Sequence, residues 1–239
     1  VEAIFSQLQQ ACDQYGITLI GGHTEITYEL PRTLAIGAML GEVNKKDVVL
    51  TSGAQPGDAI VLTRGIAIEG AAILAREASN TLRDQGVALE VIDQASNLLF
   101  DPGISVSIDT TIARSAVQLH SMHDPTEGGL VTALRELAEA AEVGIILNRE
   151  KVPVLPECDS ICSALKLDPL GLIASGALIA TVSPKDAPTL IEAFHQEGVV
   201  ACVIGYITEA NEGLVLIDNH KMQPLPSFER DELARFFSS

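Results

Sequence analysis

The sequence predicts an α/β or α+β fold. Short apolar runs of strand length alternate irregularly with longer segments in which apolar residues recur every three or four positions, as in amphipathic helices. The chain has 239 residues, of which 47% are hydrophobic and 20% charged, typical of a globular protein with one large or two modest domains. There is no internal repeat and no low-complexity tract, which argues against a repeat array.

The first fifty residues predict a helix followed by two strands. Apolar residues at helical spacing run from Val1 to Tyr15, and Gly16 closes the helix. Strands are predicted at 17–20 and 33–43, on either side of a glycine-rich loop. Because the chain begins with Val1 inside a helical pattern, we expect further sequence upstream, with a processed or engineered start as the alternative.

A turn separates this region from the rest of the chain. The segment 51–58 contains two glycines and one proline, which is typical of a turn. We therefore place a first domain at 1–50 and a second at 51–239. In the second, periodicity predicts strand 59–63, helices 66–77, 89–99, 107–119 and 129–142, strand 144–147, helix 158–165, strand 177–182, helix 185–197, strands 199–206 and 214–217, and a last helix from Glu229.

The charge of the chain excludes several classes of partner. Asp and Glu number 32 against 15 Lys and Arg, which gives a formal net charge of −17. Nucleic acids and anionic membranes attract basic surfaces, so we expect neither as a partner. A phosphate ligand would need Mg²⁺ to screen the carboxylates.

Cysteine use and the absence of targeting signals predict a cytoplasmic protein. The four cysteines are too few and too scattered for a disulfide framework. No apolar run reaches the roughly 18 residues of a membrane helix. No basic segment precedes a short apolar stretch as in a secretory signal.

The sharpest local motif is the turn and helix start at residues 124–129. Thr126 is the predicted N-cap, and Gly128 and Gly129 occupy the first turn. Glycine costs about 1 kcal/mol relative to alanine in a helix, whereas bare N–H groups at a helix start suit a phosphate. Asp124 could hold the accompanying Mg²⁺. The alternative, ordinary capping with glycines that permit tight packing, is equally compatible with the spacing.

A second glycine-rich loop follows the first predicted strand. Paired glycines there let backbone approach a ligand, and three polar side chains follow at once. Glu25 could bind a metal, Thr24 could donate to a phosphate, and His23 could do either. The alternative is a solvated turn. The residues are Gly21, Gly22, His23, Thr24 and Glu25.

Other candidate motifs fail. Gly65 to Gly70 has P-loop spacing, but Ala71 and Ala72 follow where Lys and Ser or Thr are required. No G-x-G-x-x-G motif occurs, so a Rossmann site has no support. Cys158 and Cys162 lie one helical turn apart without a second ligand pair, which favours a buried helix stripe over a zinc site.

Taken together, the two glycine-rich loops resemble the aminoimidazole ribonucleotide (AIR) synthetase superfamily. The resemblance is greatest to its HypE-like, AIR synthase-related branch. The matching segments are 21–25, 37–43, 57–65, 124–130 and 167–171.

The resemblance implies a PurM-like architecture with Mg-ATP between two domains. Residues 1–50 would be the remainder of an N-terminal domain that forms a dimeric β-barrel, without its upstream glycine-rich and Asp-rich segment. Residues 51–239 would be the C-terminal α/β domain. It implies ATP-dependent phosphoryl transfer to an acceptor oxygen, in hydrogenase maturation or a related biosynthetic step.

The resemblance also assigns roles to residues. Asp124 would be a catalytic residue and metal ligand, with His23 as a second catalytic candidate and Glu25 as a second metal ligand. Gly21, Gly22, Thr24, Thr126, Gly128 and Gly129 would face the nucleotide. In thiamine-monophosphate kinase an Asp stands at the position of His23, which speaks against His23 as a metal ligand.

Two departures from HypE concern the substrate. HypE ends in a cysteine that carries the group it dehydrates, whereas this chain ends in Ser239. Ala174-Ser175-Gly176 stands where HypE has an acidic residue before the glycine. We therefore expect a separate small-molecule acceptor. The alternatives are a nucleotide-binding accessory protein without turnover and an inactive fragment of such an enzyme.

Overall fold

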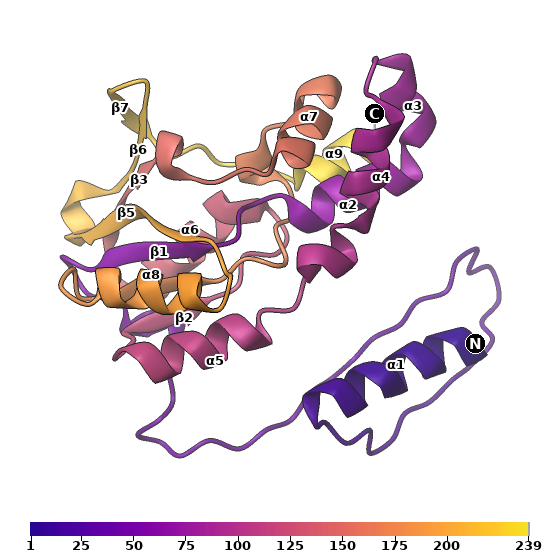
Figure 1. Cartoon of the computed structure of the whole chain (residues 1–239), viewed down its shortest axis with the longest axis horizontal. Coiled ribbons are helices and arrows are strands. Elements are labelled where there is room, and N and C mark those ends of the chain that lie inside the picture. The colour runs from indigo at the N-terminus through magenta and orange to yellow at the C-terminus, as the bar shows by residue number, and fades with distance from the viewer. Residues whose placement is uncertain (239) are drawn as a thin grey trace. The chain divides into compact units, whose positions relative to one another are not determined.

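The structure is a computed structural model that describes residues 1–238. It divides into two compact units, Val1–Val43 and a second that begins at Asn44. Each unit is described by itself (Figure 1). The division falls a few residues before the turn at Thr51 that marks the predicted domain boundary.

The first unit contains helix α1, Glu2–Tyr15. The helix ends as predicted at Gly16, which adopts a left-handed φ of 64°, and Ile17 N–H then bonds to the Cys12 carbonyl at 2.8 Å.

The two strands predicted at 17–20 and 33–43 do not form, so that prediction is wrong. A strand needs a neighbour for its backbone hydrogen bonds, and no described segment pairs with either stretch. Apolar side chains here stay in water, with Ile20 86% and Ile36 96% exposed.

The second unit is built on one sheet. Among the described residues it has seven strands in the order β2-β4-β1-β5-β3-β6-β7, and only the β3–β6 pair is parallel. The strands are β1 (Ala59–Thr63), β2 (Ser121–His123), β3 (Gly144–Asn148), β4 (Ile179–Val182), β5 (Ala201–Thr208), β6 (Leu214–Asp218) and β7 (Lys221–Pro224).

Helices cover both faces of this sheet (Figure 1). Ile60 and Leu62 of β1 pack in the cluster that contains α6, while Ala59 and Val61 pack with α5 and α8. A third apolar cluster joins α2, α4 and α7. The helices are α2 (Ile68–Glu77), α3 (Ser79–Asp84), α4 (Leu89–Asn97), α5 (Ser107–Ala116), α6 (Gly129–Ala141), α7 (Pro156–Leu165), α8 (Ala187–Gln196) and α9 (Glu232–Ser238).

Every element predicted after residue 58 forms, with its ends moved by a few residues. Burial on both faces explains why β1 is a continuous apolar run rather than an alternating one. The sequence reasoning missed α3, β2 and β7. Strand β2 has only three residues and β7 is exposed throughout, so neither carries a hydrophobic period.

Several strands begin or end along the same edge of the sheet, the one that runs across the strand ends. Thr63 at the end of β1 pairs with Ala201 at the start of β5, and His123 at the end of β2 pairs with Ile179 at the start of β4. Leu62 also pairs with Ile179. The segments that follow β1 and β2 therefore leave the sheet at the same edge as the turn that precedes β4.

Gly205 allows β3 and β5 to approach each other. A Cβ on this residue would collide with the carbonyl oxygen of Ile146 on β3. We expect Gly205→Ala to lower the free energy of unfolding by about 1–3 kcal/mol, as overpacking does in a close-packed interior. Urea unfolding followed by circular dichroism measures it. Gly37→Ala, where a Cβ meets nothing within 4 Å, is the control, and equal stability of the two variants would contradict this packing.

Candidate functional site

Asp124 emerges from the sheet edge directly after β2. Its side chain is 62% exposed, while Pro125 beside it is buried. The imidazole of His123 lies 3.8 Å from the Asp124 carboxylate through Nδ1 and 3.0 Å from Glu136 through Nε2. The Asp124 carboxylate thus faces solvent, next to a histidine whose ring lies between the carboxylates of Asp124 and Glu136.

These charges act on each other. The carboxylates of Asp124 and Glu136 raise the pKa of His123 against the lowering effect of burial. The nearby imidazole of His123 in turn lowers the pKa of Asp124, although partial burial opposes this. Asp124 is therefore ionised at neutral pH and can serve as an oxygen ligand.

Helix α6 begins after Asp124, but not as the motif predicts. Its N-cap is Gly128, with a left-handed φ of 77°, and no side chain caps it. The prediction of Thr126 as N-cap is wrong, because the left-handed backbone of Gly128 separates it from the helix. The Thr126 carbonyl instead accepts N–H bonds from Gly129 at 3.0 Å and Ala174 at 3.3 Å.

Packing explains both glycines at this helix start, because a Cβ on Gly128 would collide with the Thr132 side chain. A Cβ on Gly129 would collide with backbone atoms of Leu170 and Leu172, so the tight-packing reading accounts for Gly129. The N–H of Gly128 donates to Oδ2 of Asp231 at 2.6 Å. Both glycines are buried, so the helix start is closed by the protein's own carboxylate.

The other predicted loop lies in the first unit. His23 Nε2 is 3.7 Å from a Glu25 carboxylate oxygen, and both side chains are largely exposed. Thr24 is exposed too, and a Cβ on Gly21 or Gly22 would meet nothing within 4 Å. The loop keeps the open backbone that a ligand needs, and the roles of its residues stay predictions.

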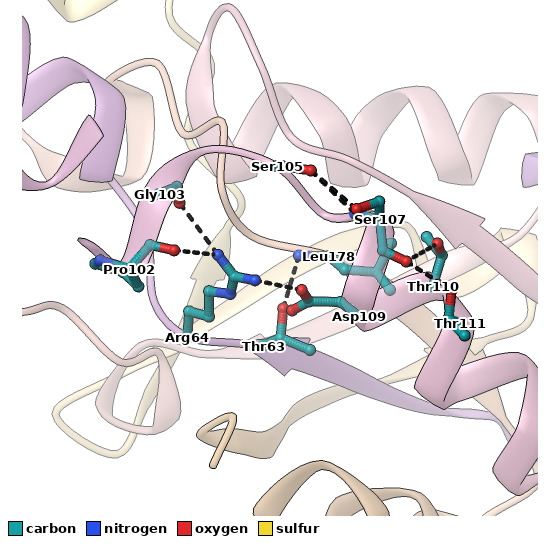
Figure 2. Close-up of polar contacts among 10 residues, drawn as sticks. All are labelled: Thr63, Arg64, Pro102, Gly103, Ser105, Ser107, Asp109, Thr110, Thr111 and Leu178. Carbon is teal, nitrogen blue, oxygen red and sulfur yellow. Dashed lines mark hydrogen bonds and ion pairs between the residues drawn. The ribbon is translucent and has the colours of Figure 1, made fainter. Parts of the chain in front are cut away.

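A buried charge pair lies at the same sheet edge and was missed by sequence reasoning. Arg64 follows β1 with a left-handed φ of 58°, and its Nη2 donates to Oδ2 of Asp109 on α5 at 2.5 Å (Figure 2). Nη1 bonds to the carbonyls of Pro102 and Gly103 at 2.9 and 3.1 Å. The Asp109 side chain is fully buried and Arg64 is 11% exposed.

The turn before β4 joins this pair to the Asp124 turn. Ala174 bonds to Thr126, whereas a Cβ on Gly176 would press on the Gly103 carbonyl held by Arg64. Leu178 N–H donates to the Thr63 hydroxyl at 3.0 Å (Figure 2). Oδ1 of Asp109 is buried with no hydrogen-bond partner among the described residues. The residues of this Arg64–Asp109 network are far apart in the sequence. The one local signal that could have indicated it is the single arginine directly after an apolar strand.

The remaining candidates are structural. Cys158 and Cys162 are buried on α7, where burial raises the pKa of the Cys162 thiol to about 12 and that of Cys158 still further above its ordinary range. Within residues 1–238 no group of three or more His, Cys, Asp or Glu could hold a metal. His120 is satisfied by Asp58, with Nδ1 2.8 Å from Oδ1.

The Arg64–Asp109 pair should behave as a buried ion pair. Arg64→Met and Asp109→Asn should each cost about 3–5 kcal/mol, because each leaves a buried charge uncompensated, and the double variant should cost less than their sum. Denaturant unfolding measures all three. Arg149→Met is the matched control, since the Arg149–Asp168 pair is about one-third exposed and should cost about 1 kcal/mol or less. Additive costs in the double variant would contradict the coupling.

The pKa of His123 can be measured directly by NMR titration of the metal-free protein. It should lie above 6.5, and Asp124→Asn or Glu136→Gln should each lower it, while Glu139→Gln on the same helix should not. Because the folded pKa is raised, this imidazolium stabilises the fold below about 6.5. That contribution is lost as pH rises through the folded pKa. A pKa at or below 6.5 would contradict the geometry.

Comparison with known proteins shows the family to which this chain belongs. Residues 55–217 match the family described as AIR synthase related protein, C-terminal domain. A putative hydrogenase expression/formation protein of Methanocaldococcus jannaschii is 28% identical over 90% of this chain and 62% of its own length. The carbamoyl dehydratase HypE of Rhizobium leguminosarum bv. viciae is 29% identical over 95% of this chain and 61% of its own. The chain spans about six-tenths of the length of these relatives.

Solved structures share the fold. The crystal structure of Escherichia coli HypE aligns with a TM-score of 0.64 at 22% identity, over 79% of this chain and 55% of that one. A HypE in complex with ATP gives 0.58 at 23% identity, over 81% and 57%. A HypE–HypF complex gives 0.55 at 20% identity, over 75% and 56%. The fold is therefore PurM-like. In the part of the chain that the structure describes, no helix is both long and apolar enough to cross a membrane.

Proposed function

Because the chain belongs to the family of AIR synthase related proteins, we propose that this protein is an ATP-dependent, Mg²⁺-requiring enzyme that activates an acceptor oxygen by phosphoryl transfer. The proposed setting is hydrogenase maturation or a related biosynthetic step. Support comes from relatives named carbamoyl dehydratase HypE and hydrogenase expression/formation protein, and from a HypE solved with ATP.

The observation that carries the proposal is the exposed, ionised carboxylate of Asp124 next to the start of α6. Mg²⁺ prefers oxygen ligands and is usually held by one or two carboxylates together with substrate phosphates. Within residues 1–238 there is no cluster of three metal ligands. A single exposed carboxylate is consistent with an ion that is bound together with the phosphates of ATP. When bound, Mg²⁺ would neutralise charge on the transferring phosphoryl group.

The chain's own groups would then bind and orient the nucleotide. Asp124 would hold the metal, and Glu25 remains a predicted metal ligand on the first unit. The positive end of α6 would favour the nearby phosphates electrostatically, although the N–H groups of Gly128 and Gly129 are themselves bonded within the protein. The imidazolium of His123 would hold a proton between Asp124 and Glu136 and so limit the repulsion between carboxylates and phosphate.

The acceptor is proposed to be a separate small molecule. Ser175 replaces an acidic residue of the HypE motif, which supports an acceptor different from that of HypE. Ser175 lies in the turn that joins the Asp124 turn to the Arg64–Asp109 network. Ser175 is thus next in sequence to Ala174, whose N–H bonds to the Thr126 carbonyl in the Asp124 turn.

The first unit is proposed to supply the dimer contact of a cytoplasmic homodimer, and its loop at Gly21, Gly22 and Thr24 is proposed to bind nucleotide. Its exposed apolar side chains support this, because Ile26 is 98% and Leu40 89% exposed and such side chains favour association. A HypE has been solved in complex with HypF, so a second protein partner is known for a relative.

Replacing Asp124 tests the function. We expect Asp124→Asn to abolish Mg-ATP turnover and to weaken Mg²⁺-dependent ATP binding about tenfold or more, because the ion loses its charged ligand. Calorimetric titration of ATP with Mg²⁺ or EDTA measures binding, and phosphate release measures turnover. Glu127→Gln, an exposed carboxylate three residues away, is the control.

Three outcomes are informative. Unchanged turnover in Asp124→Asn would exclude the proposed site. Tight Mg²⁺-dependent binding without phosphate release, across a screen of small acceptors, would favour the accessory, non-catalytic alternative, to which the loss of an acidic residue at Ser175 also points. Absence of binding would exclude nucleotide binding by this chain.

A further inference from the structure

A small cavity lies beyond the ends of β1 and β3. Both strands pair antiparallel with β5, so they run parallel to each other and end at the same edge of the sheet. The cavity has a volume of about 140 Å³. That is well above the roughly 10–15 Å³ that one water needs and below the roughly 300–1,000 Å³ of pockets for drug-sized molecules. The space therefore suits a small molecule.

One wall of the cavity is apolar and is held by the core. Ile66 forms a backbone bridge with Val154, and its N–H donates to the Pro153 carbonyl at 3.1 Å. Ile66, Val152 and Leu170, which also line the cavity, are buried in the same apolar cluster as α6. Because the core fixes these side chains, this wall needs no ligand to take its shape.

Arg149 lines the cavity with a guanidinium that is already oriented. It follows β3 in the short helix Arg149–Lys151, and its Nη2 and Nη1 donate to the Asp168 carboxylate at 3.0 and 3.3 Å. Asp168 is fixed in turn, because its Oδ1 also accepts the Leu170 N–H at 3.0 Å. A guanidinium has five N–H donors, so Asp168 leaves three of them for an anionic oxygen. The ordering of Arg149 is thus complete before any ligand binds.

Asp159 lines the same cavity from α7. Its side chain is exposed, and among the described residues its carboxylate forms no hydrogen bond or ion pair. An acid in the first turn stabilises a helix by itself, so the position of Asp159 on α7 does not indicate a ligand. Its place in one cavity with Arg149 does, because the cavity then carries free donors on a cation and free acceptors on an anion.

These charges select the class of ligand. A molecule that is only an anion would be repelled by Asp159 and by the net charge of −17. A molecule that is only a cation would face the guanidinium of Arg149. A molecule with an ammonium group and a carboxylate on one carbon offers each residue the opposite charge. A small apolar substituent on that carbon has the apolar wall to contact.

We propose that this cavity binds a small amino acid as a zwitterion, with its carboxylate on Arg149 and its ammonium group on Asp159. The inference goes beyond the proposed function and does not depend on it, since neither ATP nor Mg²⁺ takes part. If both residues are only structural, their replacement changes stability and leaves no ligand affinity to lose.

The test titrates the full chain at neutral pH, without nucleotide or metal, with alanine, propionate and ethylamine. Propionate lacks the ammonium group of alanine, and ethylamine lacks its carboxylate. The backbone amide resonances of Val152 and Asp159 in the ¹⁵N spectrum report binding at the cavity. The variants are Arg149→Met and Asp159→Asn. Their controls are Lys151→Met and Glu157→Gln, which remove like charges from the same two helices outside the cavity lining.

We expect alanine to shift both resonances saturably, with a dissociation constant on the order of 1 mM, because two charge-assisted contacts are offset by the cost of association. Propionate and ethylamine should each bind about tenfold more weakly or less, since each loses one of these contacts. Arg149→Met and Asp159→Asn should weaken alanine binding by a similar factor, and the two controls should stay within about twofold. Thermal unfolding of each variant records stability separately.

Three results would overturn the inference. Propionate or ethylamine binding as tightly as alanine would show that the cavity selects a single charge. Alanine binding that survives both Arg149→Met and Asp159→Asn would place the ligand elsewhere. No saturable shift with alanine would show that the cavity is only structural. Each of these results leaves the proposed function standing, because the Mg-ATP titrations of Asp124→Asn test that separately.

Discussion

The burial of β1 on both faces is the constraint on which the second unit depends. Five consecutive residues of this strand are buried, and it pairs with β4 on one side and β5 on the other. Because both faces of this strand are covered, polar side chains can be accommodated at its ends and not on its faces. Arg64 and Asp124 both stand directly after strand ends at one edge.

The polar groups at this edge are satisfied mainly by the protein itself. Arg64 is neutralised by Asp109 and bonds to two carbonyls, and the Gly128 amide is taken by Asp231. Asp124 differs, because its carboxylate faces solvent. In a chain of net charge −17 an exposed carboxylate beside a helix start repels a bare phosphate and attracts a cation, which is why Mg²⁺ accompanies ATP in the proposed function.

The two glycines at the start of α6 show that packing alone can account for a motif that would also suit ligand binding. Gly129 is required by the backbone of Leu170 and Leu172, and Gly128 by its left-handed φ and its closeness to Thr132. Spacing could not separate the two readings because both require a missing side chain. The structure supplies a packing reason for each glycine. The Gly128 N–H in addition donates a hydrogen bond to Oδ2 of Asp231.

The sequence by itself determined most of the elements after residue 58, because hydrophobic period and helix length are local properties. It missed α3, β2 and β7. It also led to the superfamily, through five short matching segments, and to the prediction that Asp124, in one of them, binds a metal. Only the tertiary structure decided that residues 17–20 and 33–43 are not strands, since pairing needs a partner. It alone brought together Arg64 with Asp109 and Gly128 with Asp231, which are 45 and 103 residues apart, because folding sets such contacts and local sequence does not.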